Sequence, residues 1–418
     1  MSKLSELIFA WLHLFADHRK DGKVSSVCTQ GHFWTVIPYI FKTLHELGFK
    51  LEKPENIQQK HIQAIVQHWW YRPKPLKVKT ITNYLYLLRE FCRRMGKGNL
   101  VKDIRHYLPE VDPAKLVVRS ATPKEKNWVA VALNLFEIFQ KVDQYDERLG
   151  LMLRLELAFG LRREEVLKCN PHMQDRKTYF EVFPNQGKGG RTRTIPMTPA
   201  RRLILDYVKA RAKKNGYLGW DYNRNGTQGS LKQNLKRYSN MMTALGFTKK
   251  GYGFTGHSFR ALFVENDLIL HSIIPPSAGG TTGQMDKDEL DVHRMQTVQA
   301  VGHNDSSKLN AYGVKMPVAK TPDAPDRCRN NIQNGLAALP FELPDVEEAH
   351  LQECLIIRDV MDKKGIGITL KQAQVLWAEH SNRLGLPWAP IEGDIAIALE
   401  VAAISIMRES RPEGGLAA

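Results

Sequence analysis

Only one short stretch of this chain has the pattern of β-strands, and segments with helical periodicity lie on both sides of it. Two extended runs, 178–183 and 191–197, are joined by the glycine-rich turn 185–190. Alternation around a glycine turn predicts a β-hairpin. Apolar residues recur at helical spacing in 29–48, 56–71, 81–95, 126–159, 200–214, 231–245, 346–363, 369–384 and 393–408. The sequence therefore predicts a mainly α protein with a small antiparallel β-sheet, an α+β chain.

A chain of 418 residues is expected to fold into two or three domains. Residues 1–110 are predicted to form an N-terminal helical domain, and residues 121–320 a second domain that contains the hairpin. Within the second domain, the segment near 271–295 begins with a Pro/Gly/Thr-rich stretch and is predicted to be an exposed insertion. A linker rich in Pro, Asp and Asn precedes residues 340–418, which are predicted to form a C-terminal helical extension.

Basic residues outnumber acidic ones, and they are unevenly placed. The chain has 60 Lys and Arg against 44 Asp and Glu, a formal charge of +16. Residues 1–312 hold 49 basic and 29 acidic residues (+20), whereas residues 313–418 hold 11 and 15 (−4). A basic body with an acidic tail predicts a polyanionic partner, most simply nucleic acid. A basic surface that serves only solubility is the alternative, and charge alone does not decide between them.

The cysteines and the hydropathy pattern indicate in which cellular compartment the protein is expected. Five cysteines are scattered without a CxxC pair, which argues against a disulfide framework or a zinc site and fits a reducing cytosol. No run approaches the ~18 uncharged apolar residues of a membrane span. The run 7–15 contains a histidine and lacks a small-residue cleavage site, so it is interpreted as an amphipathic helix. We expect a cytoplasmic protein without a membrane partner.

Cations line one face of the predicted helix at 81–95. Arg89, Arg93 and Lys97 recur every fourth residue, and Lys77 and Lys79 precede the helix. Such a face could lie along a phosphate backbone. An ordinary solvated helix face explains this pattern equally well.

Five groups of residues in the second domain carry candidate chemistry. They are Gly160-Leu161-Arg162-Arg163-Glu164-Glu165, Gly187-Lys188-Gly189-Gly190-Arg191, His257-Ser258-Phe259-Arg260, Gly302-His303 and Tyr312. No carboxylate cluster with metal-ligand spacing accompanies them. Arginines, a lysine, histidines and a tyrosine suit the binding of a phosphodiester while an oxygen nucleophile attacks it without a metal.

Each residue type has a physical role in such a reaction. Arg162 and Arg260 could neutralise the charge on the phosphate oxygens through directional hydrogen bonds. A tyrosine hydroxyl, with an ordinary pKa of about 10, needs a base or a cationic site to act as a nucleophile. His257 shares a helix face with Arg260, where it could transfer a proton. Lys188 could protonate the departing 5′-oxygen, and His303 could donate to the phosphate or assist the leaving group.

In this order, these segments resemble the tyrosine recombinase (phage integrase) family. Its pattern has Arg-x-x-Glu, a hairpin lysine, His-x-x-Arg, Gly-His and a tyrosine about nine residues later. The resemblance covers about 121–315, and residues 1–105 are similar to the family's core-binding domain in pattern and position only. It implies that Glu165 supports Arg162 and that Tyr312 is the nucleophile. Each motif alone is weak, but five in the right order form a strong signal.

Several of these residues have alternative interpretations. Arg162 with Glu165 could be a plain helix ion pair. Arg191 and Arg193 compete with Lys188 for the catalytic position, or touch DNA phosphates. His303 could be a helix-entry residue, and Tyr312 a packing tyrosine. His271 and His293, inside the expected insertion, are not predicted to be catalytic.

The resemblance implies a site-specific DNA recombinase or integrase with a 3′-phosphotyrosine intermediate. It would act on double-stranded DNA as a tetramer on two sites, in the integration or excision of a mobile element, with accessory DNA-bending proteins as possible partners. It needs no cofactor, metal or ATP. A type IB topoisomerase-like enzyme, a catalytically silent DNA-binding accessory protein and a metal-dependent nuclease are the alternatives. The role of the extension after Tyr312 stays open among packing on a neighbouring protomer, recruiting another protein and covering the basic site.

Overall fold

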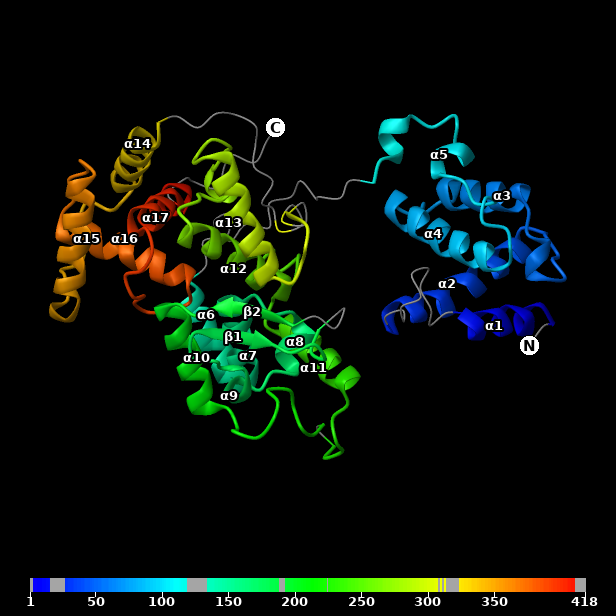
Figure 1. Ribbon diagram of the computed structural model, residues 1–418, viewed down its shortest axis with the longest axis horizontal. Coiled ribbons are helices and arrows are strands. Elements are labelled where there is room, and N and C mark those ends of the chain that lie inside the picture. Colours follow the sequence, from blue (N-terminus) through cyan, green and yellow to red (C-terminus); the bar gives the residue numbers. More distant parts are fainter. Residues whose placement is uncertain are drawn as a thin grey trace. The chain divides into compact units, whose positions relative to one another are not determined.

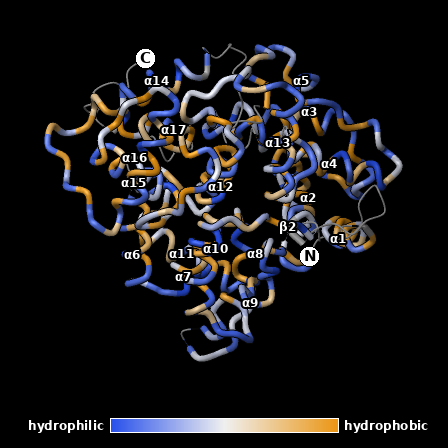
Figure 2. Tube along the Cα trace, turned by 60° about the vertical axis from the view of Figure 1, so that its left-hand side comes forward, coloured by the Kyte–Doolittle hydropathy of each residue, from blue (hydrophilic) through white to orange (hydrophobic). Residues whose placement is uncertain are grey.

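The computed structural model has the predicted mainly helical fold with one two-stranded antiparallel sheet (Figure 1). The structure describes residues 3–15, 27–118, 134–187, 192–223, 225–306, 309, 312 and 323–409. The chain divides into two compact units, Met1–Ser120 and Ala121–Ala418. Along the helices of both units, hydrophobic and hydrophilic residues follow one another, as amphipathic packing requires (Figure 2).

All the regular elements among the described residues of the first unit are helices. Its elements are α1 (Lys3–Phe15), α2 (Val27–Glu46), η1 (Pro54–Asn56), α3 (Gln59–Tyr71), α4 (Val78–Arg94), α5 (Ile104–Tyr107) and η2 (Pro113–Leu116). The α4 stripe predicted from the sequence is buried, with Ile81, Leu85 and Leu88 among its core residues. Trp69 of α3 is fully buried, and its ring packs on Tyr84 of α4 with the ring centroids 5.4 Å apart.

The second unit is built around a buried helix. Its first elements are α6 (Leu135–Tyr145), α7 (Glu147–Phe159), α8 (Arg163–Leu167), α9 (Pro171–Gln174), β1 (Tyr179–Val182), β2 (Arg193–Pro196), α10 (Pro199–Arg211), α11 (Leu231–Ala244), α12 (Gly256–Leu270), η4 (Pro276–Ala278) and α13 (Lys287–Ala300). Every residue of α7 from Leu149 to Phe159 is buried, and α6, α10 and α12 pack against this helix. It is therefore the scaffold on which the later motifs are arranged.

The predicted hairpin is present. The strands pair with Phe180 opposite Ile195 and Val182 opposite Arg193. Phe180 and Ile195 are fully buried, and the Phe180 ring stacks on Phe159 at the end of α7 with the ring centroids 4.4 Å apart. This contact fixes the sheet to the end of the central helix.

The segment 271–295 differs from the exposed insertion that we expected. Ile273, Ile274 and Ala278 are buried, and the second part of the segment belongs to α13, which packs against α12 and β2. The Pro/Gly-rich composition correctly indicates little regular structure in the first part, but it does not indicate exposure. The apolar residues within it cover the end of α12.

The C-terminal helices belong to the same compact unit as residues 121–320. They are α14 (Ala324–Ala337), η6 (Glu348–His350), α15 (Leu351–Lys363), α16 (Leu370–Arg383) and α17 (Ile395–Glu409), and in Figure 1 they lie together beside α12 and α13. The last three agree with the predicted helices, whereas α14 lies in the predicted linker. Ile269 and Ile274 share a core with α17, and Arg383 Nη2 lies 3.2 Å from Glu265 Oε2 of α12. None of the described helices is long and apolar enough to span a bilayer.

Candidate active site

The position of Arg162 follows from the way α7 ends. Gly160 adopts a left-handed conformation (φ 56°) and terminates the helix. A Cβ atom at this position would lie 2.5 Å from the Phe263 ring, so only glycine fits the turn. Two residues later Arg162 precedes α8, and its side chain remains 28% exposed. The turn thus presents Arg162 at the surface and directs the Gly160 carbonyl inward.

Glu165 is the counter-charge of the site. Its side chain is 1% exposed, and its carboxylate accepts hydrogen bonds from Arg162 Nη1 (2.6 Å) and from Arg193 Nη1 and Nη2 (2.8 and 2.7 Å). Burial raises the pKa of this carboxyl, but Arg193, Arg162 and Arg260 together outweigh burial and lower it to about 2. Glu165 is therefore ionised at neutral pH and holds the surrounding guanidinium groups in place.

Arg260 is almost completely buried. Its side chain lies one turn into α12, and its Nη1 and Nη2 atoms donate to the carbonyls of Gly160 and Val301. Burial and the neighbouring cations Arg162 and Arg193 lower its pKa to about 10, while Tyr312 and Glu165 oppose this shift. Arg260 thus stays charged at neutral pH in a place with little water, where its electrostatic effect on a bound anion is strong.

The structure brings Tyr312 into contact with both predicted histidines and with Arg260. Its side chain is 4% exposed, its hydroxyl accepts a hydrogen bond from Arg260 Nε (2.9 Å), and His303 Nε2 lies 3.2 Å from the same oxygen. The exposed ring of His257 stacks on the tyrosine ring with the centroids 5.3 Å apart. Residues of α12 and the loop residue His303 therefore meet at Tyr312, with Arg260 and His303 at its hydroxyl.

Gly302 allows the loop before His303 to approach the arginines. Its φ of 68° lies in the left-handed region, and a Cβ atom there would lie 3.3 Å from Arg193 Nη1 and 3.4 Å from Arg162 Nη1. The preceding carbonyl, that of Val301, accepts hydrogen bonds from Arg162 Nη2 (3.1 Å) and from Arg260 Nη2. Gly302 thus lets the backbone turn so that the Val301 carbonyl meets the arginines, and it also places His303 in the site.

Arg193 has different surroundings from those expected of a residue that contacts DNA. Only 8% of it is exposed, and its guanidinium is bound to Glu165. On β2 it shares the inward face with Ile195, while Thr194 points outward. The alternation of side chains along the strand could therefore have indicated that Arg193 faces inward, where a buried cation needs a partner.

Lys188 and Arg191 lie outside the described residues. Gly187, which precedes Lys188, packs on the central carboxylate, because a Cβ atom there would lie 2.5 Å from Glu165 Oε1. The hairpin turn therefore starts at the site.

The predicted DNA-contacting residues of the first unit fall into two groups. Lys77 and Lys79, at the start of α4, are exposed. The other three are bound within the unit: Arg89 donates to the carbonyls of Val101 and Lys102, Arg93 pairs with Glu90, and Lys97 Nζ contacts the carbonyls of Glu55 and Ile57. These three cations therefore stabilise loops and a helix turn of their own unit. Their regular spacing in the sequence does not reveal these contacts.

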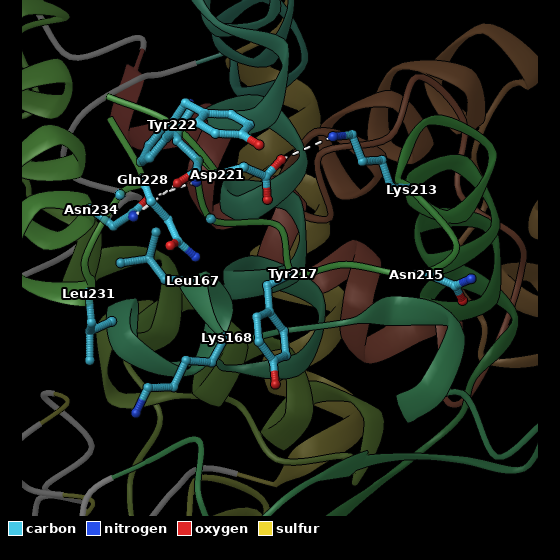
Figure 3. A pocket seen from close by; sticks show the side chains of 13 residues that line it. Leu167, Lys168, Lys213, Asn215, Tyr217, Asp221, Tyr222, Gln228, Leu231 and Asn234 are labelled. Carbon is cyan, nitrogen blue, oxygen red and sulfur yellow. Dashed lines mark hydrogen bonds and ion pairs between the residues drawn. The ribbon is translucent and has the colours of Figure 1, made fainter. Parts of the chain in front are cut away.

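Several cavities lie in the described part of the second unit. One is beside the site, between β2 and α13, and is lined by polar groups that include Arg193 and His303. Another lies under the loop between α10 and α11, where the Lys213–Asp221 ion pair (3.0 Å) crosses between the labelled side chains (Figure 3). None of the predicted site residues lines this cavity under the loop. Among the described residues, no group of three or more His, Cys, Asp or Glu could hold a metal ion.

Comparison with known proteins gives matches among solved structures. A lambda integrase dimer bound to a COC′ core site matches with 15% identity and a TM-score of 0.47, covering 77% of this chain and 80% of the other. The Tn1549 transposon integrase in complex with circular intermediate DNA matches with 14% identity and a TM-score of 0.45, covering 77% and 97%. XerA recombinase matches with 13% identity and a TM-score of 0.30, covering 73% and 93%. All three are tyrosine recombinases. No protein-family model and no curated protein matches the sequence.

Proposed function

We propose that this chain is a site-specific DNA recombinase that cuts and rejoins strands through a phosphotyrosine intermediate. The observation that carries the proposal is the contact of the Tyr312 hydroxyl with Arg260 Nε (2.9 Å) and His303 Nε2 (3.2 Å) in one site. Arg162, which immediately precedes α8, adds a second arginine that is held by Glu165. A tyrosine oxygen held beside a buried arginine and a histidine is suited to attack on a phosphodiester.

In the proposed reaction, the Tyr312 oxygen forms a bond to phosphorus while the bond from phosphorus to the 5′-oxygen breaks. The tyrosine proton passes to His257, whose ring stacks on the nucleophile. The departing 5′-oxygen takes a proton from Lys188, and His303 donates to a phosphate oxygen. A 5′-hydroxyl of another strand then attacks the phosphotyrosine and reverses these steps. One phosphoester replaces another, so neither ATP nor a metal is required.

The two arginines have different tasks in this proposal. Arg162 is 28% exposed and meets the phosphate first, whereas Arg260 is 1% exposed and already bound to Tyr312. A phosphate oxygen therefore reaches Arg260 by replacing its hydrogen bond to the tyrosine hydroxyl. This exchange frees the hydroxyl for attack at the moment when the phosphate is held.

The wider setting is proposed from the resemblance of the motifs. The substrate is double-stranded DNA, and the active form is a tetramer on two DNA sites, with accessory DNA-bending proteins as further partners. Integration or excision of a mobile genetic element in the cytoplasm is the proposed role. In the first unit, the exposed Lys77 and Lys79 are the proposed contacts to the DNA backbone.

Covalent trapping tests the proposal. The chain is incubated with fragmented genomic DNA and EDTA, denatured adducts are recovered, and their DNA and attached peptide are identified. We expect adducts at a few recurring sites, linked through Tyr312 and lost in Tyr312→Phe. Adducts spread evenly over sequence would instead favour a topoisomerase-like enzyme. Tight DNA binding without adducts would favour an accessory protein. In a parallel reaction with Mg²⁺ in place of EDTA, cleavage that does not need Tyr312 would favour a nuclease.

A further inference from the structure

A buried carboxyl group lies beneath the helix turn that carries His257. Glu156 of α7 is 1% exposed, in a run of buried apolar residues. The hydroxyl of Tyr238, on α11, lies 2.9 Å from Glu156 Oε1 and 3.0 Å from Oε2. Neither residue belongs to the motifs that predicted the site, and the proposed reaction gives neither of them a role.

The first residue of α12 rests on this pair. A Cβ atom at Gly256 would lie 2.7 Å from the Tyr238 hydroxyl oxygen and 3.6 Å from Glu156 Oε2. The helix start is therefore in direct contact with the two side chains, and a methyl group there would push it away. His257 is the next residue, and its ring contacts Tyr312.

We propose that Glu156 and Tyr238 are positioning residues that fix the first turn of α12 and hold His257 against Tyr312. The inference rests on the proposed function, since it assigns the pair to the strand-cleavage reaction. Gly256 belongs to this positioning device, which consists of Glu156, Tyr238 and the first turn of α12, because the absence of a side chain lets the helix start approach the pair. The pair is at the opposite end of α12 from the C-terminal helices, which contact Glu265 and Asn266.

The charge of Glu156 links this device to pH. The groups that face it are Tyr238 from α11, Arg163 and Glu165 from α8, and Arg260 from α12. Burial raises the pKa of Glu156 to about 8, although the Tyr238 hydrogen bond and both arginines act in the opposite direction. The carboxyl is thus mostly protonated at pH 7. Above about pH 8 it becomes a buried negative charge beneath the helix start, where it attracts Arg260 and the positive end of the helix dipole.

Single-turnover adduct formation by the full chain, on a DNA site recovered by trapping, tests the device. At pH 7, Gly256→Ala and Tyr238→Phe are expected to form adducts about tenfold more slowly than the wild type, with unchanged DNA binding. Glu156→Gln keeps an oxygen for the Tyr238 hydroxyl, so it is expected to retain the wild-type rate at pH 7. It is also expected to lose the change of rate near pH 8 that the wild type shows.

Glu265→Gln is the matched control. Glu265 is a buried carboxyl on the same helix, and burial also raises its pKa, but it faces Arg383 instead of the site. This variant is expected to keep the wild-type pH profile even where it lowers stability. Wild-type rates in both Gly256→Ala and Tyr238→Phe, or identical pH profiles in Glu156→Gln and the wild type, would overturn the inference.

A second readout does not depend on activity. The ring proton signals of His257 are followed by NMR from pH 5 to 10, without DNA. An inflection near pH 8 is expected in the wild type and in Glu265→Gln, and it is expected to be absent in Glu156→Gln. If the wild type forms no adduct but shows this inflection, the proposed function fails while the coupling of Glu156 to His257 stands. If the inflection is missing from the wild type, the coupling itself is refuted.

Discussion

Replacing Glu165 by glutamine tests how the site holds three positive charges together. The glutamine keeps the size of the side chain but removes its charge. Arg162 and Arg193 would lose their ionic partner, and Arg260, whose Nη1 lies 3.9 Å from Glu165 Oε2, would lose a nearby counter-charge. Because Arg193 and Arg260 are buried, water cannot replace the carboxylate. We therefore expect Glu165→Gln to destabilise the second unit.

The magnitude follows from the pKa of Glu165 and from the general cost of breaking a buried ion pair. Lowering the Glu165 pKa from 4.5 to about 2 corresponds to roughly 3 kcal/mol of folding free energy at neutral pH. Removing one partner of a buried ion pair typically costs about 3–5 kcal/mol. The lowered pKa also fixes the sign of the pH dependence. The contribution is fully present above the unfolded pKa of 4.5 and is lost as the pH falls through about 2.

Urea unfolding of the full chain, resolved by hydrogen exchange of individual peptides, measures this change in residues 121–418 separately from the first unit. With a slope of about 3 kcal/mol per molar urea, the midpoint of Glu165→Gln is expected to fall by about 1 M at pH 7. The difference is expected to shrink towards zero as the pH approaches 2. Glu164→Gln is the matched control on the same helix, because Glu164 is 43% exposed and pairs with Lys168. It should change stability by less than about 1 kcal/mol.

Two results would refute this reasoning. Equal midpoints for the wild type and Glu165→Gln at pH 7 would mean that the arginines do not depend on the carboxylate. A constant difference between pH 7 and pH 2 would mean that the loss comes from packing and not from charge.

Three other predictions concern single positions. Gly302→Ala should lower the free energy of unfolding by about 1 kcal/mol or more, because of its left-handed backbone and the close Arg193 guanidinium, and urea unfolding measures this. Burial raises the pKa of the Cys92 thiol to about 12, so iodoacetamide at pH 7 should label Cys92 only after unfolding, as peptide mass spectrometry would show. Lys77→Ala and Lys79→Ala should each weaken DNA binding and reduce the slope of log affinity against log salt by about 1, measured by fluorescence anisotropy.

The sequence was informative about local structure and about which residue types carry the chemistry. The hairpin and α4 follow from alternation and from a helical stripe, which depend on neighbouring residues only. The motif order grouped Arg162, Arg260 and Tyr312, and the structure places these three residues in one neighbourhood. Their catalytic roles remain proposals.

Contacts between distant segments could not be predicted in the same way. The surroundings of Arg193 depend on the strand register and on a carboxylate 28 residues earlier in the chain. The binding of Lys97 to backbone carbonyls depends on a loop 40 residues away. Glu156 did leave a signal, because a lone carboxylate inside an apolar helix must find a partner when it is buried. The pattern does not say which partner.

The packing of the C-terminal helices bears on the open question of the extension after Tyr312. In this structure they lie on their own chain: α17, apolar along most of its length, shares a core with Ile269 of α12, and Arg383 of α16 pairs with Glu265. Burying apolar surface and a charged pair of this kind makes the helices part of the unit and not a mobile tail. The helix that carries His257 and Arg260 is consequently fixed at both ends, by the Glu156–Tyr238 pair at its start and by the C-terminal helices near its end. Such double anchoring is what a site needs when buried cations and a tyrosine hydroxyl must keep hydrogen-bond distances before any substrate arrives.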